Sequence, residues 1–122
     1  MKISAMTIRP NSSIVIQRVE DDRMLKFLQE EVDGFFEKVH LDGRYSMFIN
    51  EDGLRLNLSF NRIASAMVNG GSMTLIDPSS HPYITGAIVG SAVVLGEPTP
   101  QGDETDVPPL VIVRALKIMA QR

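Results

Sequence analysis

Two short runs of β-branched residues open the chain and predict a β-hairpin. Ile3 to Ile8 and Ser13 to Val19 are rich in Ile, Val and Thr. Between them stand Arg9-Pro10-Asn11-Ser12, in which the proline and the asparagine preset turn geometry. Two such runs on either side of a short turn segment are typical of paired antiparallel strands.

The next apolar positions follow the period of a helix. They recur every three or four residues over residues 22–33, which predicts one amphipathic helix. Asp21 or Asp22 is placed to cap the free amides at its start, and Gly34 to end it in a left-handed conformation. The apolar positions are Met24, Leu25, Phe27, Leu28 and Val32.

Strand-like runs return after this helix. Phe35 to Leu41 and Tyr45 to Ile49 are joined by Asp42-Gly43, a dipeptide typical of hairpin turns. The polar segment Asn50-Glu51-Asp52-Gly53 then predicts a turn into a further strand over Leu54 to Leu58.

The second half combines a helix signal with two strand signals. Asn61 to Val68 predicts a short helix that ends at Asn69-Gly70-Gly71, and Met73 to Ile76 predicts an edge strand. Ala87 to Leu95 is almost continuously apolar, which indicates a strand covered on both faces. Gly90 within this run indicates a bulge or the close approach of another segment.

The last segment carries signals for both strand and helix. Val111-Ile112-Val113 favours a strand by propensity. A narrow polar stripe at helical spacing, preceded by the acidic loop over residues 97–106, favours a helix and matches its dipole. We therefore predict a C-terminal helix over residues 107–121. The stripe consists of Arg114, Lys117 and Gln121.

This predicted helix is apolar over most of its circumference, so the sheet of its own domain covers only part of it. Burial of the remaining apolar side chains in a homodimer is one hypothesis, with Leu110, Val113 and Leu116 at the interface. The alternative is a helix that lies buried between the sheet and a loop. The sequence leaves both interpretations open.

Together the elements predict a single α+β domain over residues 1–122, a length typical of one domain. We expect one mostly antiparallel sheet, formed by the opening hairpin and the later strands, with a helix packed on it and an extra C-terminal helix. The order of hairpin, helix and further strands is also that of the beginning of a β-grasp domain, so that subtype stays open.

The composition argues against most metal and covalent chemistry. The chain has no cysteine and two histidines, His40 and His81, which disfavours disulfides, thiolate nucleophiles and multi-histidine zinc sites. No catalytic or cofactor-binding motif is recognisable, so we expect no cofactor, no metal and no enzyme. The longest apolar run, residues 84–95, is too short to span a membrane, and we expect a cytoplasmic protein without a membrane partner.

The net charge of −3 conceals an uneven distribution of charges. No Lys or Arg occurs over residues 63–113, whereas acidic residues continue through that stretch. DNA-binding proteins draw much of their affinity from Lys and Arg side chains on phosphates. Nucleic-acid binding is therefore disfavoured, and a small anion site would depend on residues outside this stretch.

Asn61 and Arg62 are the first candidates for a binding site. An arginine at a helix start can clamp a carboxylate or a phosphate, and the free amides of the helix favour the same anion. The structural alternative is that Asn61 caps the helix and Arg62 pairs with an acid such as Glu51. Asn50 and Glu51 are the other candidates, although their turn lacks the spacing of a calcium loop and is explained by Gly53 at positive φ.

Segments spread over residues 2–97 carry a family resemblance. Its most specific element is Asn50-Glu51-Asp52-Gly53 followed by Asn61-Arg62, and Met24 to Gly34 and Ile88 to Gly96 also take part. On these segments the chain resembles domain-of-unknown-function family 3846, small proteins of actinobacteria, other bacteria and their phages. The longer link over Leu54 to Phe60 and the C-terminal helix depart from the family pattern.

The resemblance implies a phage-type accessory gene product and supplies no reaction, ligand or catalytic residue. The leading hypothesis is therefore a non-enzymatic phage or prophage protein that acts in the host cytoplasm by binding a host protein. The alternative is a protein that binds or sequesters an anionic nucleotide in a pocket with Arg62. An uncharacterised small enzyme is the third hypothesis.

Overall fold

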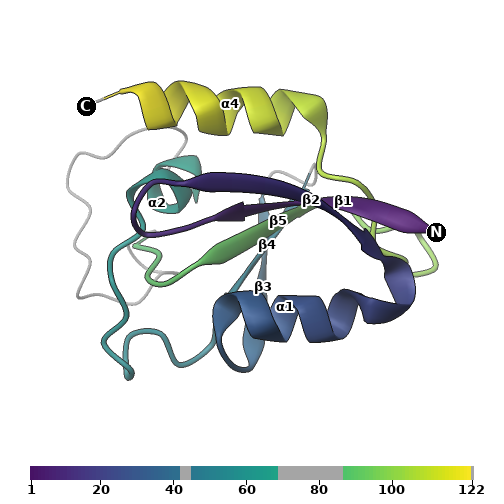
Figure 1. Cartoon of the computed structure of the whole chain (residues 1–122), viewed down its shortest axis with the longest axis horizontal. Helices are drawn as coiled ribbons and strands as arrows, with labels where there is room; N and C mark the ends of the chain where they lie inside the picture. The colour runs from purple at the N-terminus through teal and green to yellow at the C-terminus, as the bar shows by residue number, and fades with distance from the viewer. Residues whose placement is uncertain (42–44, 69–86, 122) are drawn as a thin grey trace.

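The computed structural model describes residues 1–41, 45–68 and 87–121, and its centre is a five-stranded sheet (Figure 1). The strands lie in the order β2-β1-β5-β4-β3, and every ladder is antiparallel. The predicted α+β fold with an antiparallel sheet is therefore confirmed. The strands are β1 Lys2–Ile8, β2 Ile14–Glu20, β3 Phe36–Leu41, β4 Tyr45–Asn50 and β5 Ala92–Gly96.

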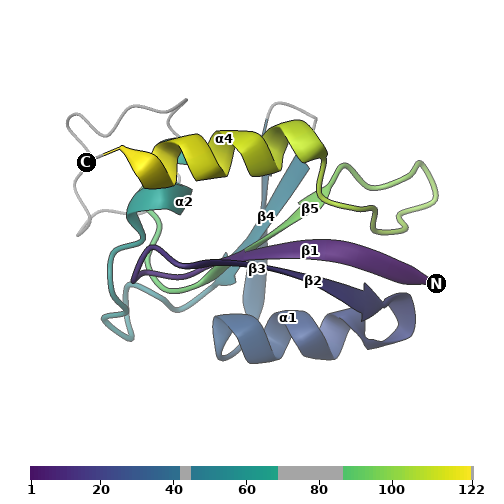
Figure 2. The same cartoon turned by 45° about the horizontal axis from the view of Figure 1, so that its top comes forward.

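Helices cover both faces of this sheet (Figure 2). Helix α1 (Met24–Val32) packs on one face, whereas α2 (Arg62–Val68) and α4 (Pro109–Ala120) lie on the other. Each face therefore has its own apolar core, and each amphipathic helix contributes one stripe to it. The stripe of α1 is Met24, Leu28 and Val32, and that of α4 is Val111, Ala115 and Ile118.

Strand β5 lies in the middle of the sheet, and all of its residues are buried. Val93 and Leu95 contact the core on the α1 side, while Ala92 and Val94 contact the core on the α4 side. A strand with both faces covered needs apolar residues at every position, which is why the continuous run predicted it. The strand begins at Ala92 and not at Ala87 as predicted.

The structure contains the paired strands of both predicted hairpins. β1 pairs with β2 and β3 pairs with β4, each in antiparallel register along its whole length. The predicted turn at Asp42-Gly43 and the predicted strand over Met73 to Ile76 lie outside the described residues.

The predicted N-terminal cap of α1 is wrong. Neither Asp21 nor Asp22 caps the helix with its side chain. Both belong to a short 3₁₀ helix, η1 (Asp21–Arg23), which leads directly into α1. A continuous 3₁₀ turn at a helix start takes the place of a separate capping residue.

The C-terminal end of α1 also differs in detail from the prediction. The residue in the left-handed conformation is Asp33 (φ 61°), and Gly34 follows it with φ 152°. The Asn50 side chain lies against this end, since its amide nitrogen donates to the carbonyls of Val32 (2.9 Å) and Asp33 (3.2 Å). Aspartate adopts this conformation more readily than most residues, and Asn50 satisfies the carbonyls that the helix leaves free.

No strand forms over Leu54 to Leu58, contrary to the prediction. Residues 51–57 form consecutive turns. The Leu56 amide donates to the Asp52 carbonyl (2.8 Å), and the Leu58 amide donates to the Gly53 carbonyl (3.0 Å). These local hydrogen bonds use the amides that strand pairing would need.

Two glycines allow this turn segment to pack closely against residues 89 and 90. Gly53 lacks the predicted positive φ; a Cβ there would lie 2.8 Å from Cγ2 of Val89. Gly90 has φ 78°, and a Cβ on it would lie 2.7 Å from Cδ1 of Leu58. The close approach predicted at Gly90 is therefore confirmed, and the need for glycine at position 53 comes from packing.

The C-terminal segment is helical, as predicted. The β-grasp subtype is not observed, because that fold joins its first and last strands in parallel whereas β1 and β5 run antiparallel here. Among the described residues, no helix combines the length and the hydropathy that a membrane span requires.

Candidate functional site

Asn61 links three parts of the chain through its buried side chain. Its amide nitrogen donates to the carbonyls of Ile8 and Gly90, each at 2.9 Å. Its amide oxygen accepts from the Ala64 amide at 3.1 Å and so caps α2. The Asn61 side chain therefore ties the end of β1 and the segment before β5 to the start of α2.

Arg62 contacts the end of another helix. Its guanidinium donates to the carbonyls of Ile118 (3.0 Å) and Met119 (3.3 Å), in the last turn of α4. In return, the Arg114 guanidinium of α4 donates to the carbonyl of Met67 in α2 (3.1 Å). Each of the two helices thus carries an arginine that donates to the other helix, Arg62 to two carbonyls and Arg114 to one, and these contacts take the place of the expected pairing with Glu51.

Asn50 and Glu51 line a small pocket of about 220 Å³ between β4 and the turn that follows it. Asn61 and Arg62 do not line this pocket, so the structure does not bring the four candidate residues together. The pocket carries three carboxylates and one guanidinium, a charge balance that repels anions. The charged residues of the lining are Glu37, Glu51, Asp52 and Arg55.

A larger, acidic hollow of about 790 Å³ lies at the end of the sheet where the chain begins. The Lys2 side chain and the Met1 amino group are its basic members. The hollow depends on the loop over residues 99–106 folding back beside β1, where the Ser4 amide donates to the Asp106 carboxylate at 2.7 Å. Its acidic lining consists of Asp21, Asp22, Asp103, Glu104 and Asp106.

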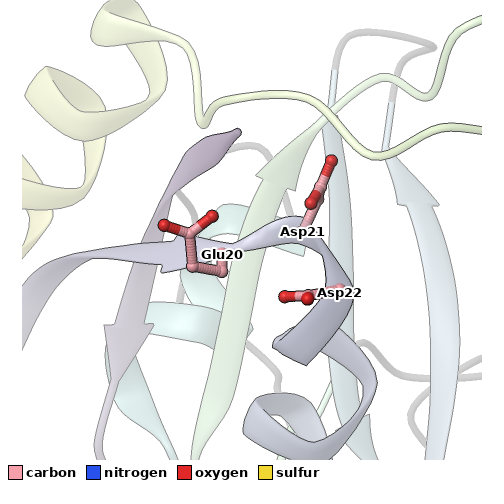
Figure 3. A group of neighbouring side chains, drawn as sticks. All are labelled: Glu20, Asp21 and Asp22. Carbon is pink, nitrogen blue, oxygen red and sulfur yellow. The ribbon is translucent and has the colours of Figure 1, made fainter.

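Glu20, Asp21 and Asp22 form an acidic cluster at the corner between β2 and α1 (Figure 3). Their nearest carboxylate oxygens lie within 4.8 Å of one another, a spacing at which oxygen ligands can share a cation. The Met1 amino group already contacts this cluster, at 3.3 Å from Glu20 and 3.7 Å from Asp21. These two carboxylates raise the pKa of the amino group, with the hydrogen bond to Glu20 as the largest cause.

The outward side of α4 presents an apolar surface to solvent. Four of its large apolar side chains are exposed, whereas the opposite side of the helix is buried in the core. We call these four residues the α4 face. They are Leu110 (80% exposed), Val113 (46%), Leu116 (43%) and Met119 (38%).

The three residues proposed from the sequence for an oligomer interface all belong to the α4 face. Sequence reasoning missed Met119, although its spacing of three residues from Leu116 is a usable signal. It also missed Ile16 of the edge strand β2, which is 47% exposed. Ile16 pairs with Met6, a residue of the core on the α4 side, so it faces the same side of the sheet as α4.

No curated protein and no solved structure matches this chain. A family model matches residues 1–120, and the match therefore includes α4, which the resemblance drawn from residues 2–97 did not cover. The chain belongs to the family described as domain of unknown function DUF3846.

Proposed function

We propose that this protein is a non-enzymatic accessory protein that acts by binding another protein through the α4 face. The observation that carries the proposal is the exposure of Leu110, Val113, Leu116 and Met119 along one helix. Scattered single apolar residues are normal on a protein surface, whereas adjacent ones on one element are typical of interaction sites. The core does not need this face, because α4 is anchored by its opposite side.

The proposed partner is a host protein, and the proposed setting is the host cytoplasm of a phage or prophage gene product. The host partner and the phage setting both come from the family resemblance. The surface chemistry supports a protein partner, since an exposed helix with a large apolar side chain at every third residue fits a groove or a second helix.

An anionic nucleotide is the second candidate ligand, and the geometry gives it less support. The Arg62 guanidinium already donates to two carbonyls of α4, and the pocket beside Asn50 and Glu51 is acidic. A bound nucleotide at a hundred times its dissociation constant would add about 2.7 kcal/mol to the free energy of unfolding. We expect nucleotides to leave the melting temperature unchanged, and a clear rise would favour this candidate.

Capture experiments with two matched variants test the proposed function. The immobilised protein is incubated with lysate of the organism that carries it, beside the variants Leu116→Glu and Leu25→Glu. Leu25 is a suitable control because it is also exposed (62%) but lies on α1, on the other face of the sheet. We expect a captured protein that Leu116→Glu loses and Leu25→Glu retains.

The two variants must melt like the wild type for this comparison to hold. A protein captured equally by both variants would overturn the assignment to the α4 face. Capture of nothing above background by the wild-type protein would overturn the proposed function.

A further inference from the structure

We propose that residues 97–107, the segment between β5 and α4, form a releasable strap, and that β1 and β5 extend their pairing when the strap leaves. We call this segment the strap. It lies at the end of the sheet where the chain begins and leads through Pro108 into α4 (Figure 2). Its release does not involve the α4 face, so it is a property of the fold that is independent of the proposed partner.

The ladder between β1 and β5 ends before either strand does. Its last pair at this end is Met6 with Val94, whereas β1 begins at Lys2 and β5 continues to Gly96. In the register of this ladder, Ser4 is the residue that would face Gly96. Both residues remain in the sheet, because each pairs with the strand on its other side.

The backbone groups of Ser4 and Gly96 are directed towards each other's strand. In the hairpin of β1 and β2, the Asp21 amide donates to the Met1 carbonyl, so the odd-numbered residues of β1 direct their backbone groups at β2. The even-numbered residues, Ser4 included, therefore direct theirs at β5. Ser4 and Gly96 are thus placed to form a hydrogen-bonded pair, in which two backbone hydrogen bonds are exchanged.

The strap binds these groups in place of that pair. The Ser4 amide donates to the Asp106 carboxylate at 2.7 Å, and the Ser4 carbonyl accepts from the Val107 amide at 2.9 Å. The Gly96 amide donates to the Thr105 carbonyl at 3.0 Å. The same groups would also have partners if Ser4 and Gly96 paired with each other. Backbone hydrogen bonding therefore separates the inserted and the released positions of the strap by little free energy.

Other contacts of the strap act in opposite directions. Burial of Val107, which is 3% exposed, favours the inserted position. Glu104 opposes it in part: one carboxylate oxygen contacts Lys38 at 3.3 Å, but the other is buried and has no hydrogen-bond partner among the described residues. We therefore expect the inserted position to predominate and the released one to be a minor state of the native protein.

The strap also forms one wall of the acidic hollow. Thr99 and residues 102–106 line the hollow together with the first residues of β1 and the start of α1. Release of the strap removes this wall and lengthens the β1–β5 ladder in the same step. This end of the sheet then has two arrangements, one with the hollow and one with the longer ladder.

Amide hydrogen exchange followed by NMR distinguishes this change from simple fraying. In the released position the Val107 amide loses its acceptor, whereas the amides of Ser4 and Gly96 find acceptors in each other's carbonyls. We expect the Val107 amide to exchange at least about tenfold faster than those of Ser4 and Gly96, after correction for intrinsic rates. Fraying of this end of the molecule would expose all three amides together.

Gly96→Ala is the variant that favours release. A Cβ at this position would collide with the Thr105 hydroxyl and the Asp106 carbonyl of the inserted strap. Gly96 lies in the extended backbone of β5, so alanine adds this collision without backbone strain. We expect the Val107 amide to exchange at least about tenfold faster than in the wild type. An NOE between the amide protons of Ser4 and residue 96 should also appear, which marks a hydrogen-bonded antiparallel pair.

Substitutions in the strap itself provide a second variant and its controls. Asp106→Ala removes the acceptor of the Ser4 amide and should also accelerate exchange at Val107. Asp106→Asn keeps an acceptor oxygen and should restore much of the wild-type rate. Asp103→Ala is the matched control, since Asp103 is an exposed acidic residue of the same strap, and it should leave the rates unchanged.

A Val107 amide that exchanges no faster than those of Ser4 and Gly96 in the wild type would overturn the inference. So would a Val107 rate that neither Gly96→Ala nor Asp106→Ala raises, or an Asp103→Ala variant that behaves like Asp106→Ala. All of these measurements are made on the protein alone, so failure of the strap and failure of the proposed function are separately visible.

Discussion

At the scale of single residues, two asparagines join separate parts of the chain through side-chain hydrogen bonds. Asn50 and Asn61 each donate two hydrogen bonds to backbone carbonyls and accept one from a backbone amide. An amide side chain offers both donors and an acceptor, which neither a carboxylate nor a hydroxyl of similar size provides. Both residues are buried, so their partners have no ready substitute in water.

Replacement of Asn61 by aspartate tests this structural role. Asn61→Asp keeps the oxygen that caps α2 but loses both donors, so the carbonyls of Ile8 and Gly90 lose their hydrogen bonds from this side chain. We expect the free energy of unfolding to fall by about 3 kcal/mol in urea denaturation. Asn57→Asp is the matched control, since Asn57 is exposed in a turn, and it should change stability by less than about 0.5 kcal/mol. Equal stability of the two variants would contradict the role.

The reciprocal arginine contacts between α2 and α4 act at the scale of whole elements. The last carbonyls of a helix lack partners within it, and cationic side chains there also interact favourably with the helix dipole. Arg62 supplies such a partner to α4, and Arg114 supplies one to α2. These contacts join two helices that are distant in sequence and hold α4 in the position that exposes its apolar face.

Truncation of Arg62 separates this role from that of a ligand site. Arg62→Ala should lower the free energy of unfolding by about 1 to 2 kcal/mol, because it leaves two carbonyls of α4 without their charged donor. Arg55→Ala is the control, since Arg55 is 71% exposed and pairs with Asp52 at the surface, and its cost should stay below about 0.5 kcal/mol. An unchanged melting curve for Arg62→Ala, together with loss of a bound ligand, would support the anion site instead.

At the scale of the whole molecule, the described surface has two chemically different regions. The apolar α4 face is exposed to solvent on one side of the molecule, and the acidic hollow lies at the end of the sheet where β1 begins. The hollow contains the Met1 amino group beside Glu20 and Asp21, so its charge depends on the protonation of that amine. The contact between the Met1 amino group and these carboxylates therefore depends on pH, and this dependence can be measured.

The pKa of the Met1 amino group is raised above its ordinary value of 8.0, first by the hydrogen bond to Glu20 and then by the charge of Asp21. The folded state therefore holds this proton more tightly than the unfolded state. The stabilisation is complete below about pH 8 and is lost as the pH rises through the raised pKa. The melting temperature of Glu20→Gln should approach that of the wild type as the pH rises from about 7 to 10.

An NMR titration of the Met1 amino group provides the direct measurement. A pKa at or below 8.0 would contradict the prediction, as would a difference in melting temperature that does not change with pH. The contact is fully exposed, so we expect a small effect that salt weakens further.

The sequence by itself determined the element types wherever one periodicity persisted. The β-branched runs on either side of a turn predicted the hairpin of β1 and β2, the helical spacing predicted α1, and the continuous apolar run predicted the central strand β5. At α4, the helical spacing of the polar stripe predicted the structure better than the strand propensity of Val111 to Val113 did. The spacing of polar residues reflects which side of the element is buried, and burial decided the conformation here. The sequence also showed that α4 carries more apolar residues than one sheet can cover.

The tertiary structure decided the ends of the elements and the roles of the candidate residues. Leu54 to Leu58 was predicted as a strand, but its amides bond locally, and Gly53 and Gly90 allow this turn segment to pack closely against residues 89 and 90. A sequence shows which groups a side chain can bind, whereas the folded chain decides which carbonyl lies within reach. Arg62 thus has the chemistry of an anion clamp, and the end of α4 lies where the anion would have been.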